Sequence, residues 1–133
     1  MLKKLTLETC RRCDLIEITR EVERVVGEDG LTDGLVVAYS PHTTAGITIN
    51  ENADPSVVDD MVMKLTKVID HRDSDYRHVE GNSDSHVKTS LVGPSQTVIV
   101  EDGKLLLGRW QGIFFVECDG PRPRNLFVKT LHG

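Results

Sequence analysis

The alternation of apolar and polar positions predicts three strands in the first third of the chain. Leu2 to Thr9 alternates in this way, and Leu15 to Ile18 is a second short apolar segment. Gly34 to Tyr39 is nearly all apolar and β-branched, and Ser40-Pro41 ends it. Alternation is typical of a half-exposed strand, whereas a continuous apolar run is typical of a central strand. We therefore expect an edge strand at Leu2 to Thr9 and a central strand at Gly34 to Tyr39.

The rest of the chain predicts more strands and one tight turn. His42 begins a polar corner that leads into a second alternating strand, which runs toward Asn52. Asp102-Gly103 is the dipeptide of a tight hairpin, so we expect the chain to reverse there. The remaining strands are expected at Val87 to Gly93, Thr97 to Val100, Leu105 to Leu107, Gly112 to Glu117 and Asn125 to Thr130.

Two segments have the spacing of helices. Thr19 is placed to cap a short helix from Arg20 to Val26, which Gly27 would end. Asp54-Pro55 combines a capping side chain with a first-turn proline and begins a longer helix. The apolar positions that follow keep helical spacing, and we expect them to face the core: Val57, Val58, Met61, Val62, Leu65, Val68 and Ile69.

Together these elements predict an α+β fold, a β-rich sandwich of mainly antiparallel strands with one long and one short helix, in which residues 1–133 form a single domain. The composition, 38% hydrophobic and 28% charged, is that of an ordinary globular protein. No apolar run is long enough to cross a membrane, and no secretory signal is visible, so we expect a cytoplasmic protein without a membrane partner. The net charge of −5 argues against a nucleic-acid partner.

The stretch from His78 to Lys88 concentrates the candidate chemistry. It holds two imidazoles, two carboxylates, an amide and two hydroxyls, and its Gly81 and Asn/Ser/Asp content predicts a loop. Imidazole binds borderline divalent metals and titrates near neutral pH. Such a loop is either a functional site or a solvated connection. The charged run before it, Asp70 to Asp75, predicts a solvated link in which His71 is exposed and has no role.

The three cysteines do not indicate a disulfide framework, because their number is odd. Cys10 and Cys13 form a lone C-x-x-C, which is a weak signal for zinc and lacks the strand-then-helix context of a redox motif. We interpret these two thiols as incidental. Cys118 lies far from both in the sequence.

Several motifs together resemble one family. They are Ser40 to Asn52, the central segment His78 to Gly93, and Gly103 to Ile113, whose G-x4-G-x-W-Q spacing is the most specific. Glu117 followed by Gly120-Pro121-Arg122 adds a closing strand and a basic turn. On these residues, which span nearly the whole chain, the sequence resembles the YjbQ-like proteins of family UPF0047, also called secondary thiamine-phosphate synthases.

The resemblance implies a compact domain of packed β-sheets with helices, a homotrimeric assembly and a weak thiamine-phosphate synthase activity. The implied reaction joins a pyrimidine-methyl diphosphate to a thiazole phosphate, releasing pyrophosphate. Its small-molecule partner is then a phosphorylated heterocycle. The lone C-x-x-C does not belong to the family pattern. Some relatives carry histidine at the position of Cys118, and because both side chains can ligate zinc, the resemblance leaves Cys118 as either a zinc ligand or a small buried thiol.

We expect His42, Glu80, Asp84 and His86 to be the catalytic residues. His42, His78 and His86 lie at strand ends or in loops, and three imidazoles with an open fourth position would form a catalytic metal site that favours zinc. Diphosphate chemistry usually uses magnesium held by oxygen ligands, for which Glu80, Asp84 and the substrate are candidates. Without a metal, the histidines can act as acids toward the departing pyrophosphate.

The substrate-binding candidates are hydroxyls, amides, an aromatic ring and cations: Thr43, Thr44, Asn82, Lys88, Ser90, Trp110, Gln111, Arg122 and Arg124. Guanidinium groups suit phosphate oxygens, and the prolines around Arg122 and Arg124 stiffen their turn. Trp110 either stacks on a heteroaromatic ring whose edge Gln111 reads, or belongs to the core or a subunit interface. No motif marks Ser90 as a nucleophile.

Two other functions remain open at this point. One is a metal-dependent phosphohydrolase, in which a histidine-bound metal activates water for attack on phosphate. The other is a protein that binds a phosphorylated metabolite without turnover. Tightly bound zinc would favour the hydrolase, whereas retention of a ligand without product would favour the binder.

Overall fold

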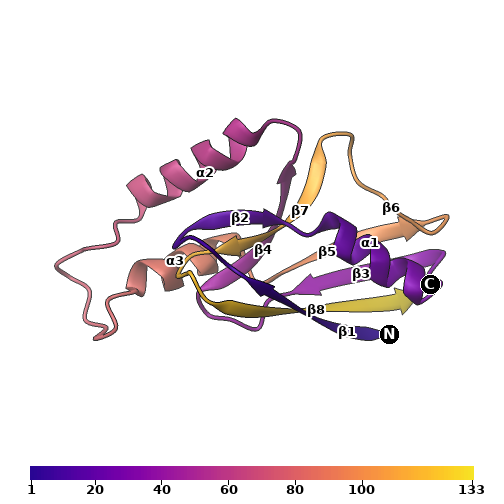
Figure 1. Cartoon of the computed structure of the whole chain (residues 1–133), viewed down its shortest axis with the longest axis horizontal. Helices are drawn as coiled ribbons and strands as arrows, with labels where there is room; N and C mark the ends of the chain where they lie inside the picture. The colour runs from indigo at the N-terminus through magenta and orange to yellow at the C-terminus, as the bar shows by residue number, and fades with distance from the viewer.

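A computed structural model describes residues 1–133 as two sheets and three helices (Figure 1). The larger sheet has the strand order β1-β8-β3-β5-β6, and the smaller has the order β2-β7-β4. All strand pairs are antiparallel, which confirms the predicted α+β class with mainly antiparallel strands. The elements are β1 (Leu2–Glu8), β2 (Asp14–Glu17), α1 (Thr19–Glu28), β3 (Asp33–Tyr39), β4 (Ala45–Glu51), α2 (Pro55–Val68), α3 (Ser83–Val92), β5 (Ser95–Glu101), β6 (Lys104–Leu105), β7 (Gln111–Glu117) and β8 (Pro123–His132).

The main core lies between the two sheets. Val36 of the central strand β3 and Val128 of β8 pack there with Ile47 of β4 and Phe115 of β7. Strand β3 lies between β8 and β5, as its continuous apolar run predicts. Strand β1 is an edge strand, also as predicted. None of the helices has the length and apolarity needed to cross a membrane.

Helix α1 adds its apolar face to this core. Val22, Val25 and Val26 are buried, as their spacing predicts. The predicted cap and end are wrong, because the helix starts at Thr19 and continues through Gly27 to Glu28. The hydroxyl of Thr19 accepts a hydrogen bond from the backbone N–H of Ile113 on β7 at 2.9 Å, so this side chain joins the helix to a strand instead of capping it.

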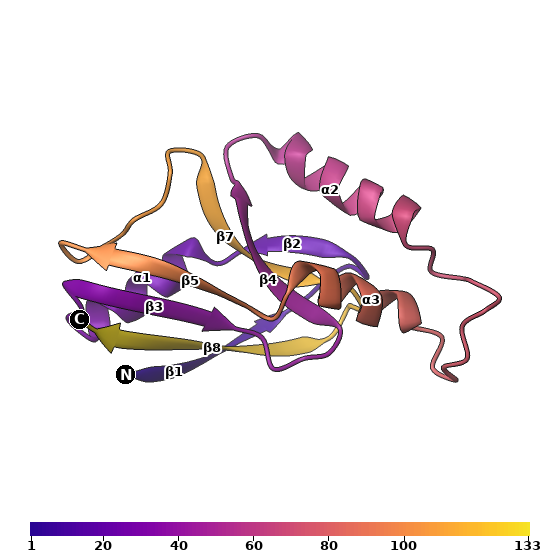
Figure 2. The ribbon, with the colours of Figure 1, turned by 180° about the vertical axis from the view of Figure 1, so that it is seen from behind.

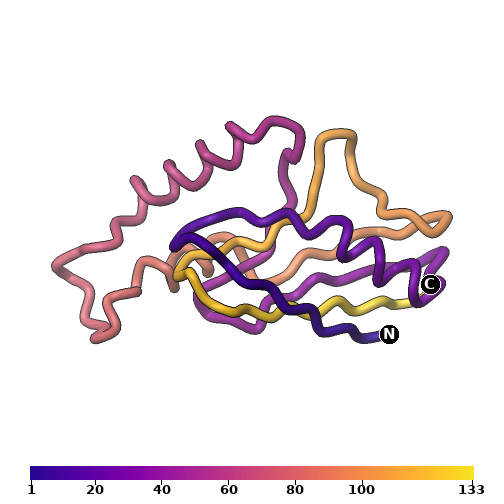
Figure 3. Tube along the Cα trace, viewed as in Figure 1, coloured from indigo at the N-terminus to yellow at the C-terminus, as the bar shows by residue number.

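Helix α2 begins where the sequence predicts but is not a core helix. Asp54 caps it by accepting from the backbone N–H of Ser56 at 2.9 Å, and Pro55 is its first residue. No residue of α2 is fully buried and Val68 is exposed, so the predicted core-facing stripe is confirmed only in part. Val58, Met61 and Val62 are half-buried against a small cluster that contains Leu15, Phe114, Val116 and Cys118. The chain trace shows α2 on the outside of the sheets, with a long loop leading to α3 (Figure 3).

The sequence predicts a loop from His78 to Lys88 and a strand from Val87 to Gly93. Residues 78–82 do form a loop, but residues 83–92 form helix α3, so the second half of the loop and the strand are wrong. The buried side chains of α3 are those of Asp84, Ser85, Lys88 and Thr89. Its apolar Val87 and Leu91 are exposed. The polarity of this helix is therefore inverted relative to an ordinary amphipathic helix, and apolar periodicity could not reveal it.

The predicted hairpin is confirmed. Asp102 and Gly103 adopt φ angles of 52° and 74°, the left-handed values of a type I′ turn, and Glu101 lies opposite Lys104. Strand β6 is shorter than predicted, because it ends at Leu105.

The fold brings three distant segments to one end of the molecule. These are the corner between β3 and β4, the beginning of α3, and the turn between β7 and β8, which lie close together in the view from behind (Figure 2). Strand β4 approaches the end of α3 so closely that a Cβ on Gly46 would lie 2.5 Å from the backbone oxygen of Gly93. Only glycine permits this approach, which holds α3 over the corner that carries His42.

Candidate functional site

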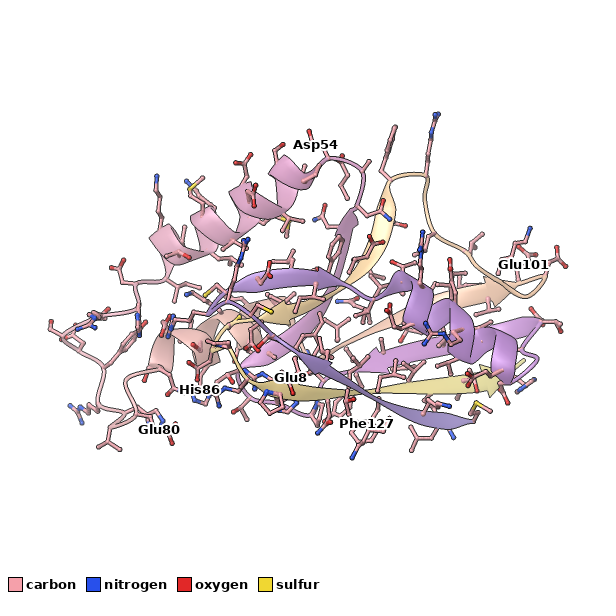
Figure 4. All side chains as sticks on the ribbon, in the orientation of Figure 1. Glu8, Asp54, Glu80, His86, Glu101 and Phe127 are labelled. Carbon is pink, nitrogen blue, oxygen red and sulfur yellow. The ribbon has the colours of Figure 1, made fainter.

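An open pocket of about 370 Å³ lies where the three segments meet. The β3–β4 corner, the loop before α3, α3 itself and the β7–β8 region all contribute to it, and none of its lining residues is hydrophobic. Figure 4 shows Glu80 and His86 at this end of the molecule, far from Glu101 at the hairpin. The lining residues are His42, Thr43, Thr44, His78, Glu80, Asn82, His86, Asp119, Arg122 and Arg124.

His42 is held in one orientation by its neighbours. Its Nε2 accepts a hydrogen bond from the backbone N–H of Asn125 at 2.9 Å, and its backbone N–H donates to Ser40 Oγ at 3.3 Å. Burial and the positive charge of Arg124 lower the pKa of His42. A neutral imidazole that accepts at Nε2 carries its proton on Nδ1. His42 therefore presents Nδ1–H as a donor.

His78 and His86 bring two further imidazoles to the pocket. Their ring centroids are 5.6 Å apart and the rings are nearly perpendicular. His86 is on α3, whereas His78 is on the loop that precedes it. The three histidines thus reach one pocket from a corner, a loop and a helix. The prediction of strand ends or loops holds for His42 and His78 and is wrong for His86.

A buried ion pair forms the base of the pocket. Arg124 donates to both carboxylate oxygens of Glu117, and its Nη2 also donates to Thr44 Oγ1 at 2.8 Å. Thr9 Oγ1 donates to Glu117 Oε2 at 2.8 Å. Burial alone would raise the pKa of Glu117, but the hydrogen bonds from Arg124, Asp119 and Thr9 lower it below its ordinary value. The positive charge of Arg124 is therefore paired with Glu117, and Arg124 supports the pocket from its buried side.

The rim of the pocket carries a free guanidinium edge and an unpaired amide oxygen. Asp119 accepts from Asn82 Nδ2 at 2.8 Å and from Arg122 Nη2 at 3.1 Å. Arg122 is about half exposed, which leaves its other donors open to the pocket. Asn82 is buried, yet its Oδ1 has no hydrogen-bond partner within the chain. A ligand here meets a cationic group at Arg122, whereas Asn82 Oδ1 is buried by its neighbours.

Asp84 and Lys88 do not reach the pocket. Asp84 is completely buried and accepts from Arg12 Nη1 at 2.9 Å and from Lys88 Nζ at 2.9 Å. Burial acts to raise the pKa of Asp84, but these hydrogen bonds and positive charges lower it to about 2. Both residues fix α3 to the segment that contains Arg12, and they position His86 rather than contact a ligand.

Three other candidates also lie outside the pocket. Ser90 is exposed on α3. Trp110 is about half exposed in the β6–β7 connection, where the guanidinium of Arg109 lies 5.0 Å from its ring centroid, so it is not a core residue. Gln111 Oε1 accepts from the backbone N–H of Gly108 at 2.7 Å. This connection lies at a distance from α3 in both ribbon views (Figures 1 and 2).

A larger hollow of about 730 Å³ lies within the loop between α2 and α3 and shares His78 and Glu80 with the pocket. His71, expected to be exposed, is half-buried here with its Nε2 3.1 Å from the backbone oxygen of Gly81. The other lining residues are Arg72, Asp73, Ser74, Tyr76 and Gly81. This hollow is open loop surface, and the convergent, hydrogen-bonded side chains belong to the smaller pocket.

The donor atoms do not fit a three-imidazole metal centre as they stand. No group of three or more His, Cys, Asp or Glu side chains is arranged to hold a metal ion. At His42, Nε2 is already an acceptor for Asn125 and Nδ1 carries the proton, so neither nitrogen offers a lone pair to a metal.

Sequence patterns missed the residues that organise the site. Thr9, Arg12 and Asp119 belong to none of the sequence motifs, and Glu117 appears among them only as part of a closing strand, with no role of its own. One signal existed for Glu117, because it ends a strand that is otherwise continuously apolar, and a buried carboxylate there requires a cationic partner. Asp84 and Lys88 have the (i, i+4) spacing of a helical ion pair.

Comparison with known proteins assigns this chain and its two-sheet α+β fold to one family. The family described as "UPF0047 protein YjbQ-like" matches residues 3–133. The UPF0047 protein YugU of Bacillus subtilis is 53% identical over 131 residues, which cover 98% of this chain and 99% of that protein. The UPF0047 protein MJ1081 of Methanocaldococcus jannaschii is also 53% identical over 131 residues, covering 98% and 94% of the two chains.

Solved structures agree with these matches. An uncharacterized conserved protein of the YjbQ/UPF0047 family from Clostridium acetobutylicum is 53% identical and superposes with a TM-score of 0.95, covering 97% of this chain and 99% of the other. A YbjQ-like protein of unknown function from Sulfolobus solfataricus has a TM-score of 0.95 at 30% identity, with 100% and 97% coverage. The chain belongs to the UPF0047, or YjbQ-like, family, which confirms the resemblance inferred from its motifs.

Proposed function

We propose that the protein binds a phosphorylated heterocyclic substrate in the histidine-lined pocket and joins a pyrimidine-methyl diphosphate to a thiazole phosphate, as thiamine-phosphate synthases do. One observation carries this proposal: three imidazoles and the open edge of Arg122 converge on a pocket without hydrophobic lining. Such a surface suits a phosphate or diphosphate better than an apolar ligand, because guanidinium and imidazole N–H groups donate to phosphate oxygens.

The chemistry follows from the charges in the pocket. When the bond between the methylene carbon and the diphosphate oxygen breaks, the thiazole nitrogen forms the new bond and pyrophosphate gains negative charge. Arg122 stabilises that charge electrostatically, and the Nδ1–H of His42 donates to a phosphate oxygen. His86 and His78 are the candidates to supply a proton to the departing pyrophosphate.

Asn82 gives the pocket a second type of recognition. Its Oδ1 is a buried acceptor without a partner in the chain, and a buried unpaired acceptor is costly unless a donor meets it. To complete it, a ring amino group or other N–H of the heterocycle would have to uncover this oxygen, which its neighbours bury. Thr43, on the β3–β4 corner, is exposed and also lines the pocket.

The activity is tested by measuring thiamine-phosphate formation from the two phosphorylated precursors. We compare the natural sequence with His86→Ala and with a matched control, His132→Ala, which removes a histidine at the far end of β8. Folding of each variant is checked by circular dichroism. Synthesis that is lost in folded His86→Ala and kept in His132→Ala supports the proposal. No synthesis by the natural sequence, or equal synthesis by all three, overturns it.

The same samples separate the two alternatives. Release of inorganic phosphate that depends on added zinc would instead indicate a phosphohydrolase, in which His42 would have to release Asn125 to bind the metal. Diphosphate binding measured by calorimetry, weakened in Arg122→Gln and without any product, would indicate a binder. Either result replaces the synthase assignment.

We also propose that the chain assembles as a homotrimer, in line with the family resemblance. The outer face of the larger sheet is not covered by a helix, and it exposes Leu35, Tyr39, Ile99 and Leu131. Leu35 lies directly opposite both Ile99 and Leu131, so these side chains form one apolar patch. Contiguous exposed apolar surface of this kind is typical of a subunit interface.

A further inference from the structure

Two cysteines that the proposed function does not use lie just beyond the paired ends of neighbouring strands, Cys13 before β2 and Cys118 after β7. Asp14 of β2 pairs with Glu117 of β7, so one further step of the antiparallel register places Cys13 opposite Cys118. The two residues are in contact, because Cys13 Sγ lies 3.8 Å from the backbone oxygen of Cys118. Cys118 shares a face of its strand with Val116, and Cys13 shares a face with Leu15, so both thiols point to the same side of the sheet.

The register puts the pair at the closer type of cross-strand position. Ile18 N donates to Ile113 O, which makes that pair a hydrogen-bonded one. Pair types alternate along an antiparallel ladder, so one step beyond Asp14 and Glu117 is a non-hydrogen-bonded position, at which the Cα atoms of a regular ladder are about 4.5 Å apart. Disulfides span Cα separations of about 4.4 to 6.8 Å. The register and the contact between the two residues are therefore compatible with a disulfide.

The surroundings give the two thiols different roles. Cys13 is half-buried, and Lys88 Nζ lies 3.8 Å from its sulfur, which supplies positive charge beside a developing thiolate. Cys118 is buried, and burial raises its pKa to about 11, so it remains a thiol in the reduced protein. Both residues line the same narrow crevice with Lys88. Cys13 is thus the sulfur that meets an oxidant first, and Cys118 lies behind it.

We propose that Cys13 and Cys118 are a redox-active pair that forms an intramolecular disulfide with a small-molecule disulfide as oxidant. The Cys13 thiolate attacks one sulfur of the oxidant, forms a mixed disulfide and releases one thiolate. Cys118 then attacks the Cys13 sulfur, its proton passes to the second departing thiolate, and the protein disulfide forms. In sum, two cysteine thiols lose two electrons and two protons, and one small disulfide is reduced to two thiols.

The position of the pair links it to the rest of the molecule. Arg12, which precedes Cys13, holds Asp84 of α3, and Asp119, which follows Cys118, holds Asn82 and Arg122. The bridge would join these two segments covalently. It would also close a long loop, which we expect to raise the thermal midpoint by roughly 5 to 15 °C.

Trypsin separates the three cysteines, which makes the test direct. Cys10 falls in the peptide 5–11, Cys13 in 13–20 and Cys118 in 110–124, because cleavage does not occur before Pro123. The full chain is incubated with oxidised glutathione, quenched in acid, unfolded, and alkylated with N-ethylmaleimide before digestion. We expect peptide 13–20 linked to peptide 110–124, only Cys10 alkylated, and full reversal by dithiothreitol.

Variants locate the reacting thiols and keep the proposal falsifiable. Cys10→Ser should leave the linked peptide unchanged, whereas Cys118→Ala should stop the reaction at a glutathione adduct on Cys13. If Cys118→Ala does not fold, Cys13→Ser serves instead and should leave Cys118 alkylated after unfolding. Alkylation of all three thiols in the natural sequence, a Cys10 to Cys13 link, or a glutathione adduct on Cys13 that persists in the presence of Cys118 would each overturn the proposal.

Discussion

The Nε2 of His42 accepts a hydrogen bond from the backbone N–H of Asn125, 2.9 Å away. The bond joins the β3–β4 corner to strand β8 and decides which nitrogen of the imidazole carries the proton. Burial and the charge of Arg124 lower the pKa of the same ring. His42 is therefore a neutral donor at Nδ1 in the folded protein.

We predict that nitrogen-detected NMR shows His42 with a protonated Nδ1 and an unprotonated Nε2 at neutral pH. Because its pKa is lowered, the ring should remain neutral at pH values where an unperturbed histidine, with a pKa of about 6.5, already gains a proton. The stability linked to His42 is present above that value and is lost as the pH falls further. The variant His42→Gln assigns the signal. A ring protonated at Nε2 at neutral pH would contradict the assignment.

Asp84 should make the stability depend on acid pH. Its pKa is about 2 in the folded protein, against an ordinary value of 3.8. A carboxylate with a lowered pKa contributes stability that is present above its unfolded pKa and is lost as the pH falls from about 4 to about 2. We expect a contribution on the order of 2 kcal/mol.

Urea unfolding across that pH range checks this expectation. The natural sequence should lose stability faster than Asp84→Asn, which has no carboxylate to protonate. Asp75→Asn, in the exposed loop, is the matched control and should follow the natural sequence. Parallel curves for all three proteins would show that Asp84 is not the responsible group.

The Glu117–Arg124 pair should be costly to break from either side. Both side chains are almost completely buried, so Glu117→Gln leaves a guanidinium in the interior without its counter-charge. Removing one partner of a buried pair typically costs about 3 to 5 kcal/mol. We predict a loss of this size in the free energy of unfolding, measured with urea. Glu101→Gln, exposed at the hairpin, should change it by less than about 0.5 kcal/mol. Equal losses in the free energy of unfolding for Glu117→Gln and Glu101→Gln would contradict this prediction.

Two glycines should respond to alanine in opposite directions. At Gly46, the new Cβ would lie 2.5 Å from the backbone oxygen of Gly93, so the strand or the end of α3 must shift. At Gly27, within α1, a Cβ meets nothing within 4 Å. We predict that Gly46→Ala lowers the thermal midpoint, whereas Gly27→Ala stabilises the protein by about 0.5 to 1 kcal/mol through its helix propensity. A stabilised Gly46→Ala would refute the close approach of β4 to α3.

If the proposed trimer forms through the outer face of the larger sheet, a charge placed on that face should dissociate it. Ile99 is about half exposed there, opposite Leu35. We predict that Ile99→Lys converts the assembly to monomers, as measured by sedimentation velocity. Val68→Lys places the same charge on exposed α2 and should leave the assembly intact. A natural sequence that sediments as a monomer would remove the basis for the trimer.

The elements that the sequence predicts well are those whose signals are local. Asp54 and Pro55 begin α2, and Asp102-Gly103 makes the hairpin, because each cap or turn is formed by neighbouring residues. Helix α3 could not be predicted in this way, since Asp84 is satisfied by Arg12, 72 residues away, and Ser85 Oγ donates to the backbone oxygen of Cys118, 33 residues away. Apolar periodicity contains no information about such partners.

The candidate site, too, could be predicted from the sequence only in part. His42, His78, His86, Asn82 and Arg122 were singled out from the sequence and meet in one pocket. The sequence favours Lys88 as an anion-binding cation, but in the fold its side chain points inward and its Nζ donates to Asp84. Residue type and neighbourhood therefore indicate where chemistry concentrates, while the direction of a side chain depends on the tertiary structure.

The polar interface beneath α3 has a thermodynamic consequence. Exposure of apolar surface raises the heat capacity, whereas exposure of polar surface lowers it. Detachment of α3 alone would uncover mainly Asp84, Ser85, Lys88 and Thr89, so its heat-capacity change should be small or negative, unlike that of global unfolding. The free energy of this local opening should then vary almost linearly with temperature, and cooling should weaken the attachment of α3 less than it weakens the apolar core.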